Sequence, residues 1–279
     1  MLLTPIQACQ DYLQEASPAN LASLLAQLPP SHVITVVQHN EIQYSTLRAL
    51  IPHTLHCKPL QCKLQQDNQW AAQQFSMVDW VAYQRAFRKH PRAHRISIAK
   101  LSHSLWNTNK QNHRYHGETS LCPSCRLITE DVTHIFTCTQ PDVVEARTSA
   151  LAIFKTIMRK STPPSLHDSI FSGLDQWFTD PTLPDYLAPT AGSLLPQLQC
   201  ITKAFQAQSS IGWEGMFRGL IATYWTDAYC HTYESPSGKK HPTPSTISKL
   251  SRQWSTQLIT QLWQFRKSVW AYRNAVVHG

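Results

Sequence analysis

"LCPSCRLITEDVTHIFTC" occupies residues 121–138 and places two cysteines three positions apart, then a histidine and a cysteine four positions apart. A tight turn over the two residues between Cys122 and Cys125 aims both sulfurs at one point, as tetrahedral zinc requires. If the second pair lies on a helix, its members share one face, because residues i and i+4 lie above one another. The spacing therefore predicts a zinc site with the ligands Cys122, Cys125, His134 and Cys138.

The predicted role of this zinc is structural. Four protein ligands fill the tetrahedron, whereas a catalytic zinc keeps one position open for water. The alternative interpretation is a reduced, buried cysteine pair beside a core histidine, without a metal.

A weaker second candidate metal site consists of His53, His56, Cys57 and Cys62. It would need an irregular loop to share one ion, because two of its members are adjacent. Three other cysteines read as small hydrophobic residues: Cys9, Cys200 and Cys230.

The composition is that of a globular, intracellular protein. The chain has 279 residues, of which 42% are hydrophobic, enough for a sizeable core. Its first residues, MLLTPIQACQ, lack the basic flank of a signal peptide, and no apolar run reaches the roughly 20 residues that cross a membrane. We therefore expect a nuclear or cytoplasmic protein with no membrane partner, whose reduced cysteines bind metal more readily than they form disulfides.

The net charge of +8 is concentrated in one segment. Residues 80–117 contain eight Lys or Arg residues and no Asp or Glu, whereas the other 17 basic residues are balanced by 17 acidic ones. Histidines and aromatic residues interleave with these cations, a pattern typical of surfaces that follow a phosphate backbone. The alternative is a solvated helix face. We call these eight residues the basic stripe: Arg85, Arg88, Lys89, Arg92, Arg95, Lys100, Lys110 and Arg114.

The apolar periodicity predicts a mainly α fold with a small β element near the N-terminus. Residues 32–37 predict a strand, which can pair with residues 41–45, and the periodic segments predict helices at 7–28, 76–90, 92–106 and 141–160 and a long closing helix. Six prolines fall between Pro163 and Pro196 and suggest a linker. The predicted segments are a mixed module at 1–117, the zinc segment with its following helix at 118–160, a proline-rich linker at 161–197 and a helical C-terminal domain at 198–279.

The segment around the four metal ligands resembles the reverse transcriptase zinc-binding domain, which lies near the C-terminus of non-LTR retrotransposon polyproteins. In that family the first cysteine pair is followed by an acidic stretch, matched here by Glu130 and Asp131, and then by the histidine and the last cysteine. A Trp with Arg-Asn near the end of a later helix is matched by Trp270, Arg273 and Asn274. The resemblance implies a zinc segment that helps to hold RNA or target DNA.

The sequence therefore predicts a non-catalytic, zinc-containing protein that binds RNA or single-stranded DNA through the basic stripe. No Asp-Asp pair, phosphate loop or other catalytic motif is present. One alternative is a metal-independent ribonuclease similar to the helical HEPN family, with Arg273 and His278 at the matching spacing. Another is a protein-interaction scaffold, in which the closing helix offers a seam for self-association.

Overall fold

The computed structural model describes residues 36–38, 41–43, 61–102, 105–182, 188, 195–233 and 242–279. It divides the chain into two compact units, 1–69 and 70–279. The predicted helix at 7–28, most of the predicted strand at 32–37 and three members of the weaker candidate metal site lie outside the described residues.

The described part of the first unit contains a short β pair and a helical segment. Strand β1 (Val36–Gln38) pairs antiparallel with β2 (Glu41–Gln43), so that Val37 lies opposite Ile42. Residues 61–68 are helical and carry an ion pair of 2.7 Å between Lys63 and Asp67.

The second unit is built from helices, which confirms the prediction of a mainly helical protein. In chain order they are α4 (Ala72–Met77), α5 (Trp80–Arg88), α6 (Arg92–Ser102), α7 (Asn109–His116), α8 (Val132–Thr137), α9 (Pro141–Arg159), α10 (Pro164–Thr179), α11 (Pro196–Ile211), α12 (Trp213–Phe217), α13 (Tyr224–Thr232) and α14 (Pro244–His278).

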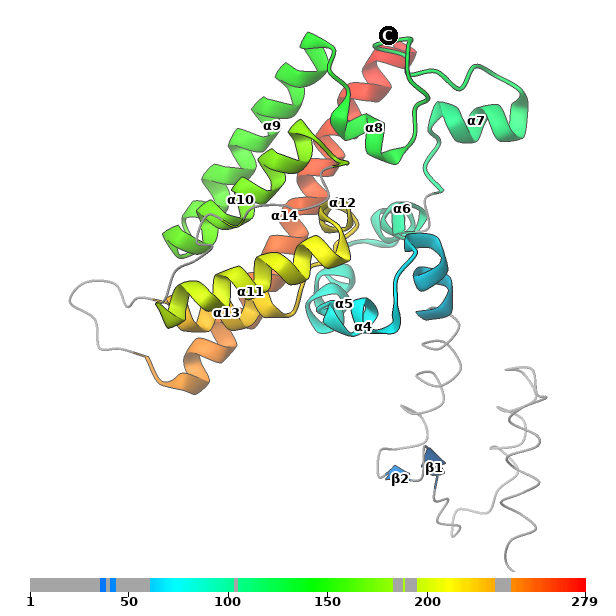
Figure 1. Cartoon of the computed structure of the whole chain (residues 1–279). Helices are drawn as coiled ribbons and strands as arrows, with labels where there is room; N and C mark the ends of the chain where they lie inside the picture. Colours follow the sequence, from blue (N-terminus) through cyan, green and yellow to red (C-terminus); the bar gives the residue numbers. More distant parts are fainter. Residues whose placement is uncertain are drawn as a thin grey trace, which may run out of the picture. The chain divides into compact units, whose positions relative to one another are not determined.

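Helix α14 is the common support of this unit. Helices α5, α9 and α13 pack along it, and its C-terminal end lies beside α8 (Figure 1). Thr243 starts it by accepting a hydrogen bond from the Thr246 amide at 3.3 Å, and Pro244 occupies the first turn, where a missing N–H is tolerated. Five of its buried apolar residues recur at steps of three and four and form one apolar stripe: Trp254, Leu258, Leu262, Phe265 and Val269.

The predicted helix at 76–90 is interrupted near its start. Val78 forms a β-bridge with Ala222, and Asp79 then caps α5 by accepting a hydrogen bond from the Ala82 amide at 2.8 Å. Pro91 separates α5 from α6, as predicted. The basic stripe is thereby divided among α5, α6 and α7.

The predicted proline-rich linker at 161–197 contains a buried helix instead. Leu166, Ile170 and Leu174 of α10 are almost fully buried in the core. Pro164 and Pro196 stand in the first turns of α10 and α11, where a proline is compatible with the helix because that N–H has no helical partner. These two prolines therefore start helices and do not mark a linker.

The predicted zinc segment packs into this core and is not a separate compact unit. Phe136 of α8 stacks on Phe217 of α12 with ring centres 4.5 Å apart, and Phe265 of α14 lies 5.5 Å from Phe217. The predicted boundaries after residues 117, 160 and 197 consequently all fall inside the second compact unit.

Candidate metal centre

The four predicted ligands come together at one point. The Sγ atoms of Cys122, Cys125 and Cys138 and a ring nitrogen of His134 all lie within 4.8 Å of one another. The sulfurs of Cys122 and Cys138 are 3.9 Å apart, and the Cys125 sulfur is 3.4 Å from His134 Nε2. One metal ion can therefore contact all four, and the described part of the chain holds no second group of three or more such residues.

A tight turn inside a short hairpin positions the first cysteine pair. The Arg126 amide donates to the Cys122 carbonyl at 2.9 Å and closes the turn, while the Cys122 amide donates to the Ile128 carbonyl at 2.8 Å. Leu121 and Thr129 form an isolated β-bridge behind it. Arg126 has a φ of 57°, the left-handed conformation that lets the chain reverse directly after Cys125.

Helix α8 positions the second pair. Asp131 caps its start by accepting a hydrogen bond from the His134 amide at 2.9 Å. Cys138 follows the last residue of the helix, and its amide donates to the His134 carbonyl at 2.8 Å. One helical turn therefore brings the imidazole and the last thiol to the same side, as their spacing predicts.

Burial and local hydrogen bonds set the protonation of the ligands. Burial raises the pKa of Cys122 and raises that of Cys138 to about 12. Burial acts in the same direction on Cys125, but hydrogen bonds from the backbone N–H groups of Leu127 and Ile128 and from the thiols of Cys122 and Cys138 together lower the pKa of that thiol. Burial also lowers the pKa of His134, so the imidazole is neutral near pH 7 and can donate its lone pair. A bound cation would release protons from the two buried thiols.

Arg147 of α9 is the cation that reaches this site. Its guanidinium donates to the backbone carbonyl of Cys138 at 3.2 Å and to that of Phe136. Burial lowers the pKa of Arg147, and the nearby Cys138 opposes that shift. Arg126, which its place in the loop suggests as a counter-charge, is exposed. Helix α9 begins between Cys138 and Arg147 in the sequence, so the spacing of the two residues does not predict that the guanidinium contacts the Cys138 carbonyl.

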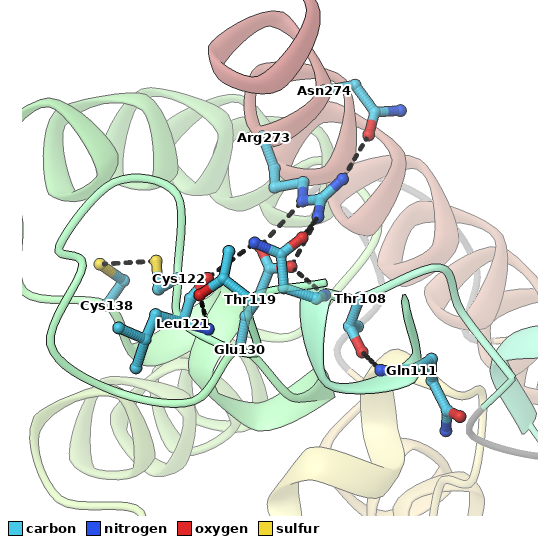
Figure 2. Close-up of polar contacts among 10 residues, drawn as sticks. Thr108, Gln111, Thr119, Leu121, Cys122, Glu130, Cys138, Arg273 and Asn274 are labelled. Atoms are coloured by element: carbon cyan, nitrogen blue, oxygen red, sulfur yellow. Dashed lines mark hydrogen bonds and ion pairs between the residues drawn. The ribbon is translucent and has the colours of Figure 1, made fainter. Parts of the chain in front are cut away.

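A buried ion pair joins the metal loop to the end of α14 (Figure 2). Arg273 donates from Nε to Glu130 Oε1 at 2.8 Å and from Nη2 to Oε2 at 2.6 Å. Glu130 is 1% exposed and also accepts a hydrogen bond from the Asn109 amide at 2.6 Å. The Asn109 side chain in turn donates to the Leu121 carbonyl at 2.7 Å and accepts from Arg273 Nη2 at 2.9 Å. This network holds α7, the metal loop and α14 together.

The periodicity of the closing helix places Arg273 away from its apolar stripe, yet the residue is buried because Glu130 pairs with it. Every nitrogen of its guanidinium donates to Glu130, Asn109 or Asn274. His278, its partner in the ribonuclease alternative, is exposed on the last turn.

Seven of the eight residues of the basic stripe are exposed, and Arg95 is partly exposed. Among the described residues, Lys110 is the one member with a recorded ion pair, 3.6 Å from Asp131. The interleaved aromatic residues behave differently: Trp106 is buried, Tyr83 and Phe87 pack against the core, and Tyr115 is 64% exposed. The cations therefore face solvent, whereas most of the aromatic rings do not.

Cys62 is exposed, Cys200 and Cys230 are partly buried, and none of the three belongs to the group of candidate ligands. None of the described helices is both long and apolar enough to span a bilayer.

No protein-family model, curated protein or solved structure matches this chain.

Proposed function

We propose that this chain is a non-catalytic, zinc-containing protein that binds RNA or single-stranded DNA through the basic stripe. Two features support the proposal: the geometry of the four ligands, and the exposed, largely unpaired cations of the basic stripe. The exposed cations support nucleic-acid binding, because a phosphate backbone binds to exposed positive charge that no acidic residue in the same segment neutralises.

The distances between ligand atoms fit a tetrahedral zinc ion. Two sulfurs bound to zinc at about 2.3 Å lie roughly 3.8 Å apart, and a bound sulfur and imidazole nitrogen lie roughly 3.5 Å apart. The corresponding distances here are 3.9 Å between the Cys122 and Cys138 sulfurs and 3.4 Å between Cys125 Sγ and His134 Nε2. Three thiolates and one imidazole also favour zinc over oxygen-seeking ions such as magnesium. Four protein ligands leave no open position, so the proposed role is structural.

The contact between Glu130 and Arg273 supports a retrotransposon origin. These residues belong to the two separate parts of the resemblance, the metal segment and the Trp-Arg-Asn motif near the end of the last helix. They are 143 positions apart and form one buried ion pair. A shared structural role explains why both motifs occur in one chain.

The same contact disfavours the ribonuclease alternative. A phosphate-binding arginine needs free donors, and those of Arg273 are directed at Glu130, Asn109 and Asn274. The scaffold alternative does not need exposed cations, so it gives no reason for the charge of the basic stripe.

Binding of labelled 20-nucleotide RNA and single-stranded DNA, followed by fluorescence anisotropy across a salt series, tests the proposal. The logarithm of the affinity should fall linearly with the logarithm of the salt concentration, with a slope of about −0.7 for each phosphate neutralised. Changing the base sequence should have little effect. An affinity that is independent of salt would refute a phosphate-binding role, and RNA cleavage lost in His278→Ala would favour the ribonuclease.

A further inference from the structure

Helices α5 and α14 enclose an open groove of about 470 Å³. The α5 wall carries residues at positions i, i+3 and i+4, and the α14 wall carries residues at i, i+3, i+4 and i+7. Both spacings correspond to one face of a helix, so the two walls are continuous rows facing one another. The lining residues are Arg85 and Arg88 on α5, Lys89 at its C-terminal cap, and Lys249, Arg252, Gln253 and Thr256 on α14.

The charge of this groove is uncompensated within the described structure. Five of its seven lining residues are cations, all five are exposed, and no carboxylate lines it. None of the ion pairs among the described residues involves these five cations. Arg252 donates from Nε to the Ser248 carbonyl at 3.0 Å, which leaves its two terminal nitrogens for another acceptor.

A second groove, between α9 and α10, shows how different this arrangement is. It also contains a cation, Lys155, but Asp168, Asp175 and Asp180 line it as well. Lys155 pairs with Asp175 at 2.9 Å. The protein itself neutralises Lys155 in that groove. The five cations between α5 and α14 repel one another until an external anion binds.

We propose that the groove between α5 and α14 is the surface that holds the phosphate backbone of a single strand. This inference rests on the proposed function and narrows it: three members of the basic stripe act together with Lys249 and Arg252, while the cations of α6 and α7 contribute little. Arginine suits this role because its planar guanidinium can donate two parallel hydrogen bonds to one phosphate.

The groove reads phosphates and not bases. No aromatic residue lines it, so the groove offers no ring on which a base could stack. The ligand class is therefore a linear polyphosphate or phosphodiester chain of any sequence. A short inorganic polyphosphate, which has no bases, should compete with an oligonucleotide for the same cations.

Three double variants test the groove. Lys249→Ala/Arg252→Ala removes two cations that lie in the groove but outside the basic stripe, and alanine preserves the helix because its helix propensity is the highest. Arg92→Ala/Lys100→Ala removes two exposed stripe cations outside the groove. Arg159→Ala/Lys160→Ala removes two exposed cations at the end of α9 and controls for net charge. Thermal unfolding checks that all three variants are folded.

Each protein is titrated into labelled oligo-dT and oligo-U at several salt concentrations, with and without inorganic polyphosphate as competitor. The groove variant should lose about tenfold or more in affinity near 0.1 M salt, and its salt slope should become shallower by about 1.4, which corresponds to two phosphate contacts. Arg159→Ala/Lys160→Ala should stay within about twofold of the parent, and Arg92→Ala/Lys100→Ala should lose clearly less affinity than the groove variant. Polyphosphate should displace the strand.

The outcomes separate the two proposals. If the groove variant binds like the parent while Arg92→Ala/Lys100→Ala loses affinity, the groove is refuted and the nucleic-acid function stands. Polyphosphate binding that depends on Lys249 and Arg252, without binding of either oligonucleotide, refutes the nucleic-acid function and also the phosphodiester ligand of the groove. Parent protein that binds no polyanion refutes both.

Discussion

Glu130 and Arg273 form a buried, two-point ion pair that fastens the metal loop to the last helix, with nitrogen–oxygen distances of 2.8 and 2.6 Å. The acid is 1% exposed and the base 8%. In such a place, the attraction between the charges offsets the loss of their hydration only while both are present.

Removing one partner should therefore destabilise the protein much more than removing both. We expect Arg273→Met to lower the free energy of unfolding by about 3–5 kcal/mol, because it leaves the Glu130 carboxylate buried without a counter-charge. Glu130→Gln/Arg273→Met should recover a large part of that loss. Urea unfolding of the parent, both single variants and the double variant gives the coupling energy. Strictly additive losses would show that the two side chains do not stabilise one another.

Purified, reduced protein should contain about one zinc per chain, measured by elemental analysis. Cys125→Ser should lose that zinc, and Cys62→Ser, which changes an exposed cysteine outside the cluster, should retain it. Metal loss should also loosen the end of α14, because Arg273 is held by the metal loop and Tyr272 packs against Cys122, Cys138 and Val143.

Hydrogen exchange locates this effect. Faster exchange is expected at residues 118–140 and 270–278, with α11 and α13 unchanged. Full zinc content in Cys125→Ser, or no zinc in the parent protein, would contradict the proposed centre.

Arg266 should be a position where removing a charge stabilises the protein. Its side chain is 1% exposed, and neither Nε nor Nη1 has a hydrogen-bond partner among the described residues. Burial lowers its pKa to about 10, although the guanidinium lies over the Trp106 ring at 4.9 Å. A cation–π contact contributes about 2 kcal/mol, less than the several kcal/mol that burying an unpaired charge costs.

Arg266→Met should consequently raise the free energy of unfolding by about 1–2 kcal/mol, since methionine fills a similar volume without a charge. Thermal and urea unfolding measure the change. Arg252→Met, at an exposed position of the same helix, should change stability by less than about 0.5 kcal/mol. A large loss of stability in Arg266→Met would mean that the guanidinium has a stabilising partner.

Two neighbouring histidines should make the fold sensitive to mild acid. The rings of His90 and His94 are 4.5 Å apart, and burial lowers the pKa of both, with Arg266 adding to each shift. Their folded pKa values lie below the unfolded value of about 6.5, so the unfolded state binds protons first as the pH falls. The part of the stability that depends on neutral His90 and His94 is therefore fully present above about pH 6.5, and it is lost as the pH falls below that value.

His90→Gln/His94→Gln should lose less stability than the parent between pH 7 and pH 5, as measured by urea unfolding at each pH. Protonation of the proposed metal ligands would lower the stability of both proteins, so the difference between the two curves is the relevant quantity. Parallel curves would show that neither histidine is protonated preferentially in the unfolded state.

Local spacing was enough to predict that the four candidate ligands come together and to predict the two long helices. The ligands lie within 17 residues, where a turn and one helical turn determine the geometry, and α9 and α14 follow from apolar periodicity. The predicted linker failed because proline has two opposite meanings, and Pro164 and Pro196 both occupy helix first turns.

Contacts across the fold were beyond the sequence. Nothing in the spacing places Glu130 opposite Arg273, or Lys249 and Arg252 opposite the cations of α5, because helix packing brings these residues together. The sequence shows that the excess positive charge lies in residues 80–117, but it does not show that Arg85, Arg88 and Lys89 face Lys249 and Arg252.

The dependence of the core on α14 also determines when the protein can finish folding. During translation at about 5–20 residues per second, roughly 7–30 s separate the synthesis of Glu130 from that of Arg273, 143 residues later. The metal ligands are all available at the beginning of this interval, whereas Phe136 and Phe217 lack the Phe265 ring that covers them until its end. On the ribosome, the metal loop can therefore form early, whereas the aromatic core closes only after the last helix has been made, and its exposed rings are prone to aggregate until then.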